Sequence, residues 1–440
     1  MSGIDTICAI ATPPGRGGVG VIRVSGPAAF AIVERLCKTL PESRRAGLRV
    51  LRDDQGQHLD SGLIVTFQGP RSFTGEDVVE IQTHGSPVVL EMIQRALVAA
   101  GARRARPGEF SERAFVNDRL DLAQAEAIAD LINAGSEQAA RAASRSLEGA
   151  LSGEVHDLAD AVIELRVWVE AALDFPDEDV DFLADGQVAE RTADLVQRLT
   201  DLAARARCGR LLNDGVRIAI IGKPNAGKSS LLNALTRRDS AIVTDIPGTT
   251  RDVLRETVSI AGMPVTLADT AGLRPTTDAV EIEGVRRAER EMLTADLLFW
   301  VVDAADPDPR PPAGLPPGLP VIRIVNKIDL TNIAPGLDHA QVRLSAKTGA
   351  GLDLLEKRVL QELGLEHSDG EFSARQRHVE AIERARGHVH KGLTEIQTTG
   401  SGELLAEELR QAADQLGEIT GRISSDELLG RIFAGFCIGK

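Results

Sequence analysis

The chain has 440 residues, of which 43% are hydrophobic and 26% are charged, so it is long and apolar enough to bury the cores of about three domains. Its formal net charge of −15, its lack of tyrosine and its aromatic content of 3% argue against an extended basic or base-stacking surface for nucleic acid. No apolar run approaches the roughly 20 residues of a membrane helix and no secretory leader is visible, so we expect a cytoplasmic protein that does not cross a membrane. No two cysteines lie close together, so we expect no disulfide framework.

Residues 1–118 mix short apolar runs with glycine and proline. The runs at 19–24, 62–67 and 78–81 have the β-branched composition of strands, and 87–99 has the pattern of a helix. We therefore predict an α+β domain at 1–118.

Residues 119–214 are rich in alanine, leucine, glutamate and arginine, which favour helix. Apolar residues from 155 to 172 recur at alternating spacings of three and four, as on one face of a helix, and Phe175-Pro176 is expected to end that helix. The same spacing returns at 405–419, so 119–214 and 373–440 are interpreted as the two parts of one all-α domain.

Between these two parts, residues 215–372 alternate apolar strands with helical stretches. The expected strands are 217–221, 264–268, 297–302, 321–325 and 342–344, an order typical of a parallel sheet in an α/β domain. The predicted fold is therefore multidomain, with the α/β domain inserted into a helical domain that is discontinuous in sequence.

The α/β segment begins with a P-loop. Residues 222–229 read GKPNAGKS, which fits G-x-x-x-x-G-K-[ST], and they lie between a predicted strand and a predicted helix. In this context backbone N–H groups surround phosphates, Lys228 reaches the β- and γ-phosphates, and Ser229 binds magnesium.

Three further motifs follow predicted strands in the order of a guanine-nucleotide domain. They are DTAG at 269–272, NKID at 326–329 and SAK at 345–347. Asp269 can hold magnesium and Gly272 can donate to the γ-phosphate. Asp329 can accept from both N1–H and N2–H₂ of guanine, which adenine cannot supply, and residues 345–347 can close over O6.

The position after the DTAG motif holds Leu273, which cannot orient water as the glutamine of Ras-type GTPases does. Asn225 offers a neutral oxygen beside the phosphates, and the loop at 244–252 (TDIPGTTRD) is suited to lie across the nucleotide. Together they can bind a monovalent cation where an arginine finger otherwise acts. The alternative is that Asn225 only forms a turn.

These motifs define the predicted GTP-binding residues, which we list in chain order: Asn225, Ala226, Gly227, Lys228, Ser229, Ser230, Thr244, Asp245, Ile246, Pro247, Gly248, Thr249, Thr250, Asp269, Thr270, Ala271, Gly272, Asn326, Lys327, Asp329, Ser345, Ala346 and Lys347.

Residues 222–347 resemble the G domains of the TrmE, Era and EngA type among translation-factor-related GTPases. The runs ATPPGRGGVG (11–20), FTGED (73–77), RPGEFSERAF (106–115) and FCIGK (436–440) narrow this resemblance to the MnmE or TrmE family of tRNA modification GTPases, over the whole chain. The resemblance implies a homodimer, a folate-binding-like N-terminal domain that also dimerises, and G domains that use potassium for catalysis.

Carried over residue by residue, the resemblance implies potassium ligands at Asn225, Thr244, Ile246 and Thr249. It implies magnesium ligands at Ser229 and Thr250. Glu281, in the matching V-E-x-x-G run, would position the attacking water; the alternative is a carboxylate that only stabilises a helix N-terminus.

The resemblance also implies a site for 5-formyl-tetrahydrofolate or a related folate at Arg23, Glu80, Arg119 and Lys440. Arg119 stands where the family pattern has lysine, which keeps the charge but changes the geometry. Cys437 is implied as a catalytic residue of the modification chemistry, with a buried structural cysteine as the alternative. Prenylation is disfavoured because Gly439 and Lys440 fit the C-a-a-X pattern poorly.

The function so implied is potassium-dependent GTP hydrolysis, with Lys228 in the catalytic set. It would act together with an FAD-dependent partner of the GidA or MnmG family in C5 (carboxymethyl)aminomethyl modification of the wobble uridine of certain tRNAs. No flavin-type G-x-G-x-x-G follows a strand here, so FAD is assigned to the partner, and tRNA is expected to bind mainly through the complex. The alternative is a regulatory GTPase that binds ribosomes or RNA without modifying it.

Overall fold

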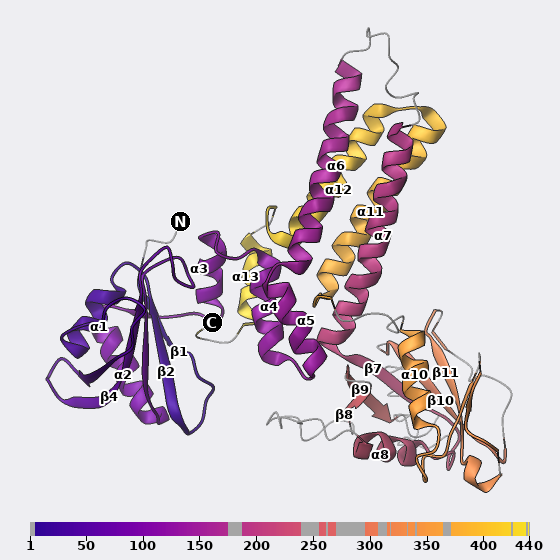
Figure 1. Cartoon of the computed structure of the whole chain (residues 1–440), viewed down its shortest axis with the longest axis horizontal. Helices are drawn as coiled ribbons and strands as arrows, with labels where there is room; N and C mark the ends of the chain where they lie inside the picture. Colours follow the sequence, from indigo (N-terminus) through magenta and orange to yellow (C-terminus); the bar gives the residue numbers. More distant parts are fainter. Residues whose placement is uncertain are drawn as a thin grey trace, which may run out of the picture. The chain divides into compact units, whose positions relative to one another are not determined.

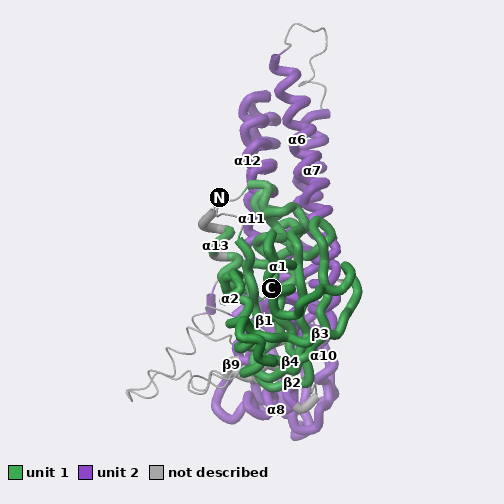
Figure 2. Tube along the Cα trace, turned by 90° about the vertical axis from the view of Figure 1, so that its left-hand side faces the viewer, with its two compact units in different colours: residues 1–129, 417–440 green, residues 130–416 purple. Residues whose placement is uncertain are grey.

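The structure is a computed structural model of the full chain, and it describes residues 5–174, 187–238, 255–260, 263–269, 295–306, 315–316, 318–331, 333–338, 341–363, 371–423, 426–436 and 439. The chain forms two compact units, residues 1–129 with 417–440 and residues 130–416 (Figure 2). The domain boundaries expected from the sequence stay a prediction; the structure groups the segment from Gly417 onward with the N-terminal residues.

The first unit is built on a sheet whose order is β3-β4-β5-β2-β1-β6, with every pair antiparallel except β1 with β6 (Figure 1). The predicted strands and helix at 19–24, 62–67, 78–81 and 87–99 are confirmed; the sequence analysis missed β1, β3, β6, α1 and α3. The bounds are β1 Ile7–Ile10, β2 Gly17–Ser25, β3 Gly47–Arg52, β4 His58–Phe67, β5 Val78–Gly85, β6 Arg103–Arg104, α1 Ala29–Cys37, α2 Pro87–Ala99 and α3 Glu109–Val116.

Helices α1 and α2 cover one face of this sheet and bury its main core, because each presents an apolar stripe to the inward residues of the strands. Phe110 of α3 packs against Ile7 and Ala9 on the opposite face. Toward the β3 edge, that face carries the exposed side chains Leu48 and Leu63, which are cross-strand partners.

A network of ion pairs joins β6 to α3. Glu109 is 3% exposed and accepts from Arg103 Nη2 at 2.7 Å and from the backbone N–H of Arg106 at 2.6 Å. Arg113 pairs with both Asp5 (2.6 Å) and Glu76 (3.0 Å). Burial opposes ionisation of Glu109, but Arg103 and the amide of Arg106 outweigh it and hold the pKa of this carboxyl below its usual value.

Glu109→Gln is expected to lower the free energy of unfolding by about 2–4 kcal/mol at pH 7, because it removes the buried charged acceptor of Arg103 and of the Arg106 amide. Since the folded pKa lies below the unfolded one, this stabilisation is complete above about pH 4.3 and is lost as the pH falls through the folded pKa. Urea denaturation from pH 3 to 7 measures it. Glu112→Gln, a change to a more exposed carboxylate of the same helix, is the control and should cost less than about 1 kcal/mol; equal losses in both variants would contradict the assignment.

The C-terminal helix α13 (Asp426–Ala434) belongs to this first unit, as does Gly439 of the FCIGK run that follows it. Phe433 and Phe436 pack against Leu122 and Ala125. Gly439 has a φ of +96°, and a Cβ there would lie 2.6 Å from the backbone oxygen of Ile10. The chain end therefore contacts the central sheet of the N-terminal residues.

The second unit contains a bundle of long helices in which α11 lies alongside α7 (Figure 1). Hydrogen bonds join residues far apart in sequence: Ser146 Oγ donates to Ser373 O (3.0 Å), and Arg375 Nη2 pairs with Asp130 (2.6 Å). The two predicted helical parts thus pack together. The bounds are α4 Leu122–Asn133, α5 Glu137–Leu147, α6 Ala150–Asp174, α7 Gln187–Asp214, α11 Gln376–Thr399 and α12 Gly402–Thr420, of which α4 and α12 each continue into the first unit.

The inserted α/β domain has a sheet of order β12-β13-β11-β10-β7-β9-β8. Its interior strands run parallel and the two edge pairs, β12 with β13 and β8 with β9, are antiparallel. The five predicted strands are found within a residue or so of their expected ends, which confirms the inserted α/β fold. The bounds are β7 Val216–Ile221, α8 Lys228–Arg238, β8 Arg255–Ile260, β9 Met263–Asp269, β10 Leu297–Asp303, β11 Val321–Asn326, β12 Gly336–Leu337, β13 Gln341–Arg343 and α10 Leu352–Glu362.

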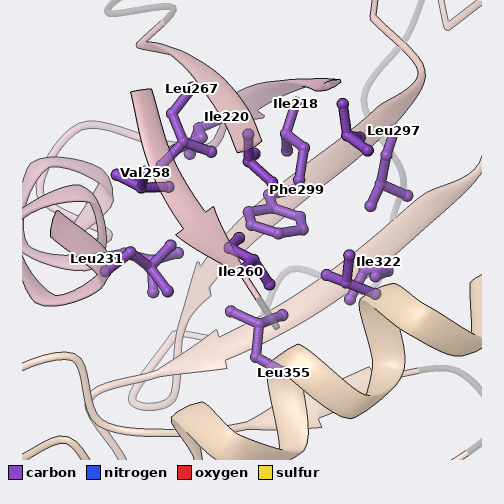
Figure 3. Packing of buried hydrophobic residues seen from close by; sticks show 14 of the residues in the cluster. Ile218, Ile220, Leu231, Val258, Ile260, Leu267, Leu297, Phe299, Ile322 and Leu355 are labelled. Carbon is purple, nitrogen blue, oxygen red and sulfur yellow. The ribbon is translucent and has the colours of Figure 1, made fainter. Parts of the chain in front are cut away.

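The core of this domain lies between the sheet and its helices. Figure 3 shows Phe299 of β10 surrounded by Ile218 and Ile220 of β7, with Leu231 of α8 and Leu355 of α10 closing the cluster. These side chains are almost fully buried, and this packing fixes the carboxyl ends of the strands. No helix within the described ranges combines the length and apolar character needed to cross a membrane.

Candidate functional site

The P-loop connects β7 to α8 at the carboxyl end of the parallel sheet. Asn225 at its tip is exposed and takes a left-handed conformation with φ of +64°, which asparagine tolerates better than most residues. Lys228 Nζ donates to the loop carbonyls of Gly222 (2.9 Å) and Lys223 (3.2 Å). The lysine that is expected to reach the phosphates is thus held over the loop itself.

The buried side chain of Asn326 joins the P-loop to the loop after β13. Its Nδ2 donates to Ala226 O (3.0 Å), and its Oδ1 accepts from the backbone N–H of Ala346 (2.9 Å). Gly227, with φ of +96°, makes room for this contact, because a Cβ there would lie 2.2 Å from Asn326 Nδ2. Three predicted motifs are therefore connected through one carboxamide.

A cavity of about 710 Å³ opens beside this connection, between the P-loop helix and the loops after β11 and β13. Ser230, Asp329, Lys347 and Thr348 are among its lining residues. The exposed carboxylate of Asp329 accepts from Ser345 Oγ at 2.6 Å, and this contact orients it. The volume and the mixed lining suit a purine base.

Lys327, inside the same motif, has a φ of +66° and pairs with Asp303 at the end of β10 (Nζ–Oδ2 2.8 Å). The Lys327 ammonium holds the pKa of the Asp303 carboxyl below its usual value. The sequence analysis did not predict that Asp303 belongs to the site, although its position as a carboxylate at the end of a predicted parallel strand could have indicated it.

Several predicted site residues lie outside the described residues. Only the backbone of Asp269, at the end of β9, is described. The others are Thr244, Asp245, Ile246, Pro247, Gly248, Thr249, Thr250, Thr270, Ala271, Gly272, Glu281, Cys437 and Lys440. Within the ranges that are described, no group of three or more histidine, cysteine, aspartate or glutamate side chains is placed to hold a metal ion.

The predicted folate residues lie in the first unit. Arg23 of β2 and Glu80 of β5 are register partners, and Arg23 Nη2 pairs with Glu80 Oε1 at 2.8 Å. The guanidinium lies over the rings of Phe73 (5.4 Å) and Phe110 (5.8 Å). Arg23 Nη1 also donates to the carbonyl of Gly439 (3.4 Å), so the end of the chain reaches this pair.

Arg119 lies at a separate cavity of about 340 Å³ in the same unit. The cavity, which we call the arginine pocket, is lined by Arg44, Phe67, Arg71, Ser72, Phe73 and Arg119. Phe73 contacts both Arg23 and this pocket, so it connects the two halves of the predicted site. The sequence analysis missed Arg44, Arg71 and Phe73, since nothing in their local sequence indicates that they meet.

Two family models match the chain: one described as the MnmE helical domain matches residues 122–437, and one described as the N-terminus of the GTP-binding protein TrmE matches residues 6–119. Together they cover almost all of the chain.

Curated relatives match over the full length. A tRNA modification GTPase MnmE of Sodalis glossinidius (strain morsitans) is 52% identical over 454 aligned residues, covering 100% of both chains. The protein of the same name from Yersinia pseudotuberculosis serotype O:1b (strain IP 31758) matches at the same identity and coverage. Among solved structures, an Aquifex aeolicus Era variant bound to GDP.AlF4- is 24% identical with a TM-score of 0.29, covering 47% of this chain and 89% of that one; so small a likeness supports no further argument.

Proposed function

Because the chain belongs to the MnmE family of tRNA modification GTPases, we propose that it hydrolyses GTP with potassium as catalytic cation and acts with an FAD-dependent GidA- or MnmG-family partner on C5 of the wobble uridine of certain tRNAs. A GTPase role in tRNA modification follows from the family itself. The observation that best supports the nucleotide-binding part of this proposal is the Asn326 connection between the P-loop and the Asp329–Ser345 pocket.

The nucleotide is proposed to lie with its phosphates on the P-loop and its guanine in the cavity beside Asp329. Asp329 would accept from N1–H and N2–H₂ of guanine, while Lys228 would exchange its loop carbonyls for phosphate oxygens. Ser229 at the start of α8, together with Thr250, would hold magnesium, which neutralises phosphate charge. Glu281 is proposed to position the attacking water.

Potassium is proposed to bind at Asn225 with oxygens of Thr244, Ile246 and Thr249. The left-handed conformation at Asn225 places an exposed carboxamide at the tip of the P-loop. A neutral oxygen suits a monovalent cation there, and the cation supplies the positive charge that an arginine finger gives in other GTPases.

Asn225→Gly tests the cation proposal, because glycine keeps the left-handed conformation and removes only the carboxamide. We expect kcat for GTP in the wild type to be at least about tenfold higher in KCl than in NaCl, and this difference to vanish in the variant while GTP affinity changes little. Steady-state hydrolysis in the two salts measures it. A variant that keeps the full potassium effect would remove Asn225 from the cation site.

The N-terminal unit is proposed to bind a formyl-tetrahydrofolate between Arg23, Glu80, Arg119 and Lys440. The Arg23–Glu80 pair offers both donors and acceptors at the sheet face, and the chain end reaches it through Gly439.

Exposed Leu48, Val50 and Leu63 on this unit support the proposed homodimer, since a second copy would cover them. Cys437 is proposed to take part in the modification chemistry.

A further inference from the structure

The arginine pocket combines three positively charged side chains with two aromatic rings around one cavity. Arg44, Arg71 and Arg119 line it together with the rings of Phe67 and Phe73. Arg44 lies over the Phe67 ring, with its guanidinium carbon 5.8 Å from the ring centre. A cavity of about 340 Å³ with this lining suits part of a small anionic ligand that also carries an aromatic group.

These three guanidinium groups are not neutralised within the part of the chain that the structure describes. None of the ion pairs among described residues involves Arg44, Arg71 or Arg119, whereas Arg23 and Arg113 of the same unit each pair with carboxylates. Among the described residues, these guanidinium groups would therefore not have to break an ion pair with a carboxylate in order to bind an anion in the pocket.

The pocket is also held in shape by the backbone. Arg44 has a φ of +63°, its N–H donates to Thr66 O (2.8 Å), and its Nη2 donates to Arg71 O (2.5 Å). The loop between β4 and β5 is fixed in turn, since Ser72 Oγ donates to Glu76 O (2.5 Å). A non-glycine residue in the left-handed region needs such support to stay there.

Phe73 gives the pocket its connection to the Arg23–Glu80 pair, because its ring faces Arg23 and also lines the pocket. A ligand that hydrogen-bonds to Arg23 and Glu80 can therefore pass along Phe73 toward Arg44 and Arg71. A folate has this construction: a neutral pterin, an aminobenzoyl ring, and a tail of one or more glutamates that carries all its negative charge.

We propose that the arginine pocket binds the glutamate tail of the folate, and that Arg44 and Arg71 give the protein a preference for folates with several γ-linked glutamates. This rests on the proposed function, which places the folate at Arg23, Glu80 and Arg119. An RNA phosphate backbone is the competing occupant, but a cavity of this size admits a glutamyl tail and not an RNA helix.

Calorimetric titration of the full-length protein with 5-formyl-tetrahydrofolate and with its triglutamate tests the proposal. Arg71→Gln is the main variant. Arg44 Nη2 donates to the backbone carbonyl of Arg71, so this substitution leaves that hydrogen bond in place. Arg44→Gln is the second variant. Arg45→Gln is the control: it removes the same charge from the position next to Arg44, and Arg45 does not line the pocket.

The wild type and Arg45→Gln are expected to bind the triglutamate about tenfold or more tightly than the monoglutamate. In Arg71→Gln and Arg44→Gln this advantage should fall to less than about threefold. The proposal is overturned if the wild type binds both folates equally, if the advantage survives in both variants, or if Arg71→Gln weakens tRNA binding and leaves triglutamate affinity unchanged. If neither folate binds to the wild type, the folate site of the proposed function is contradicted as well. Binding of both folates with equal affinity contradicts only the proposal for the glutamate tail.

Discussion

Asp329→Asn is expected to weaken GTP binding by about 10²–10⁴-fold. The carboxylate is oriented by Ser345 Oγ and is placed to accept two hydrogen bonds from guanine, each worth about 1.5–3 kcal/mol. An asparagine keeps one acceptor but directs its NH₂ toward the guanine NH₂. Fluorescence titration with a labelled guanine nucleotide measures the loss.

Xanthosine triphosphate supplies the control for this substitution, because its C2 carbonyl can accept from the new NH₂. The variant should bind the xanthine nucleotide at least about tenfold more tightly than GTP, and the wild type should show the opposite preference. If both nucleotides lose affinity equally, the substitution has disrupted the pocket, and the assignment of Asp329 to base selection is contradicted.

Gly227→Ala is expected to have the second-largest effect, on both stability and nucleotide binding. A methyl group at Gly227 would lie 2.2 Å from Asn326 Nδ2, so either the P-loop moves or the buried carboxamide gives up its hydrogen bond to Ala226 O. A buried unsatisfied amide and the positive φ together cost about 2–4 kcal/mol of unfolding free energy. Chemical denaturation should show this loss, together with at least about a tenfold drop in GTP affinity.

Gly400→Ala is the control that measures the cost of placing alanine at a positive φ without a steric clash of the added Cβ. Gly400 also has a positive φ (+69°), but nothing lies within 4 Å of an added Cβ, and it caps α11 away from the P-loop. This control should lose about 1 kcal/mol and keep its full GTP affinity. If Gly227→Ala behaves like the control, Asn326 does not connect the motifs in the way described.

The nucleotide domain was predictable because its information is local. Each motif follows a strand of continuous apolar residues, and parallel strands bring their carboxyl ends to one edge, so sequence order alone places the P-loop near Asp329 and Ser345. The insertion into the helical domain was predictable for a similar reason, since the two halves share one apolar spacing and do pack together.

What escaped prediction depends on contacts between distant residues. Strand β1 is short and apolar throughout (ICAI), and the edge strand β3 exposes Leu48 and Val50, so neither sequence alternates apolar with polar residues in a clear way. The buried role of Asn326 and the meeting of Arg44 with Arg71 and Arg119 arise only when separate loops fold together. The contact of the C-terminal segment with β1 likewise had no local signal.

Mass-spectrometric nucleoside analysis of tRNA tests the central claim most directly. Cells lacking this protein are complemented with the wild type or with Asp329→Asn. The proposed function predicts that C5-aminomethyl-type wobble uridines are missing in the deletion, return with the wild type, and stay depleted with the variant. Unchanged levels of these uridines in the deletion would contradict a role for this GTPase in wobble modification.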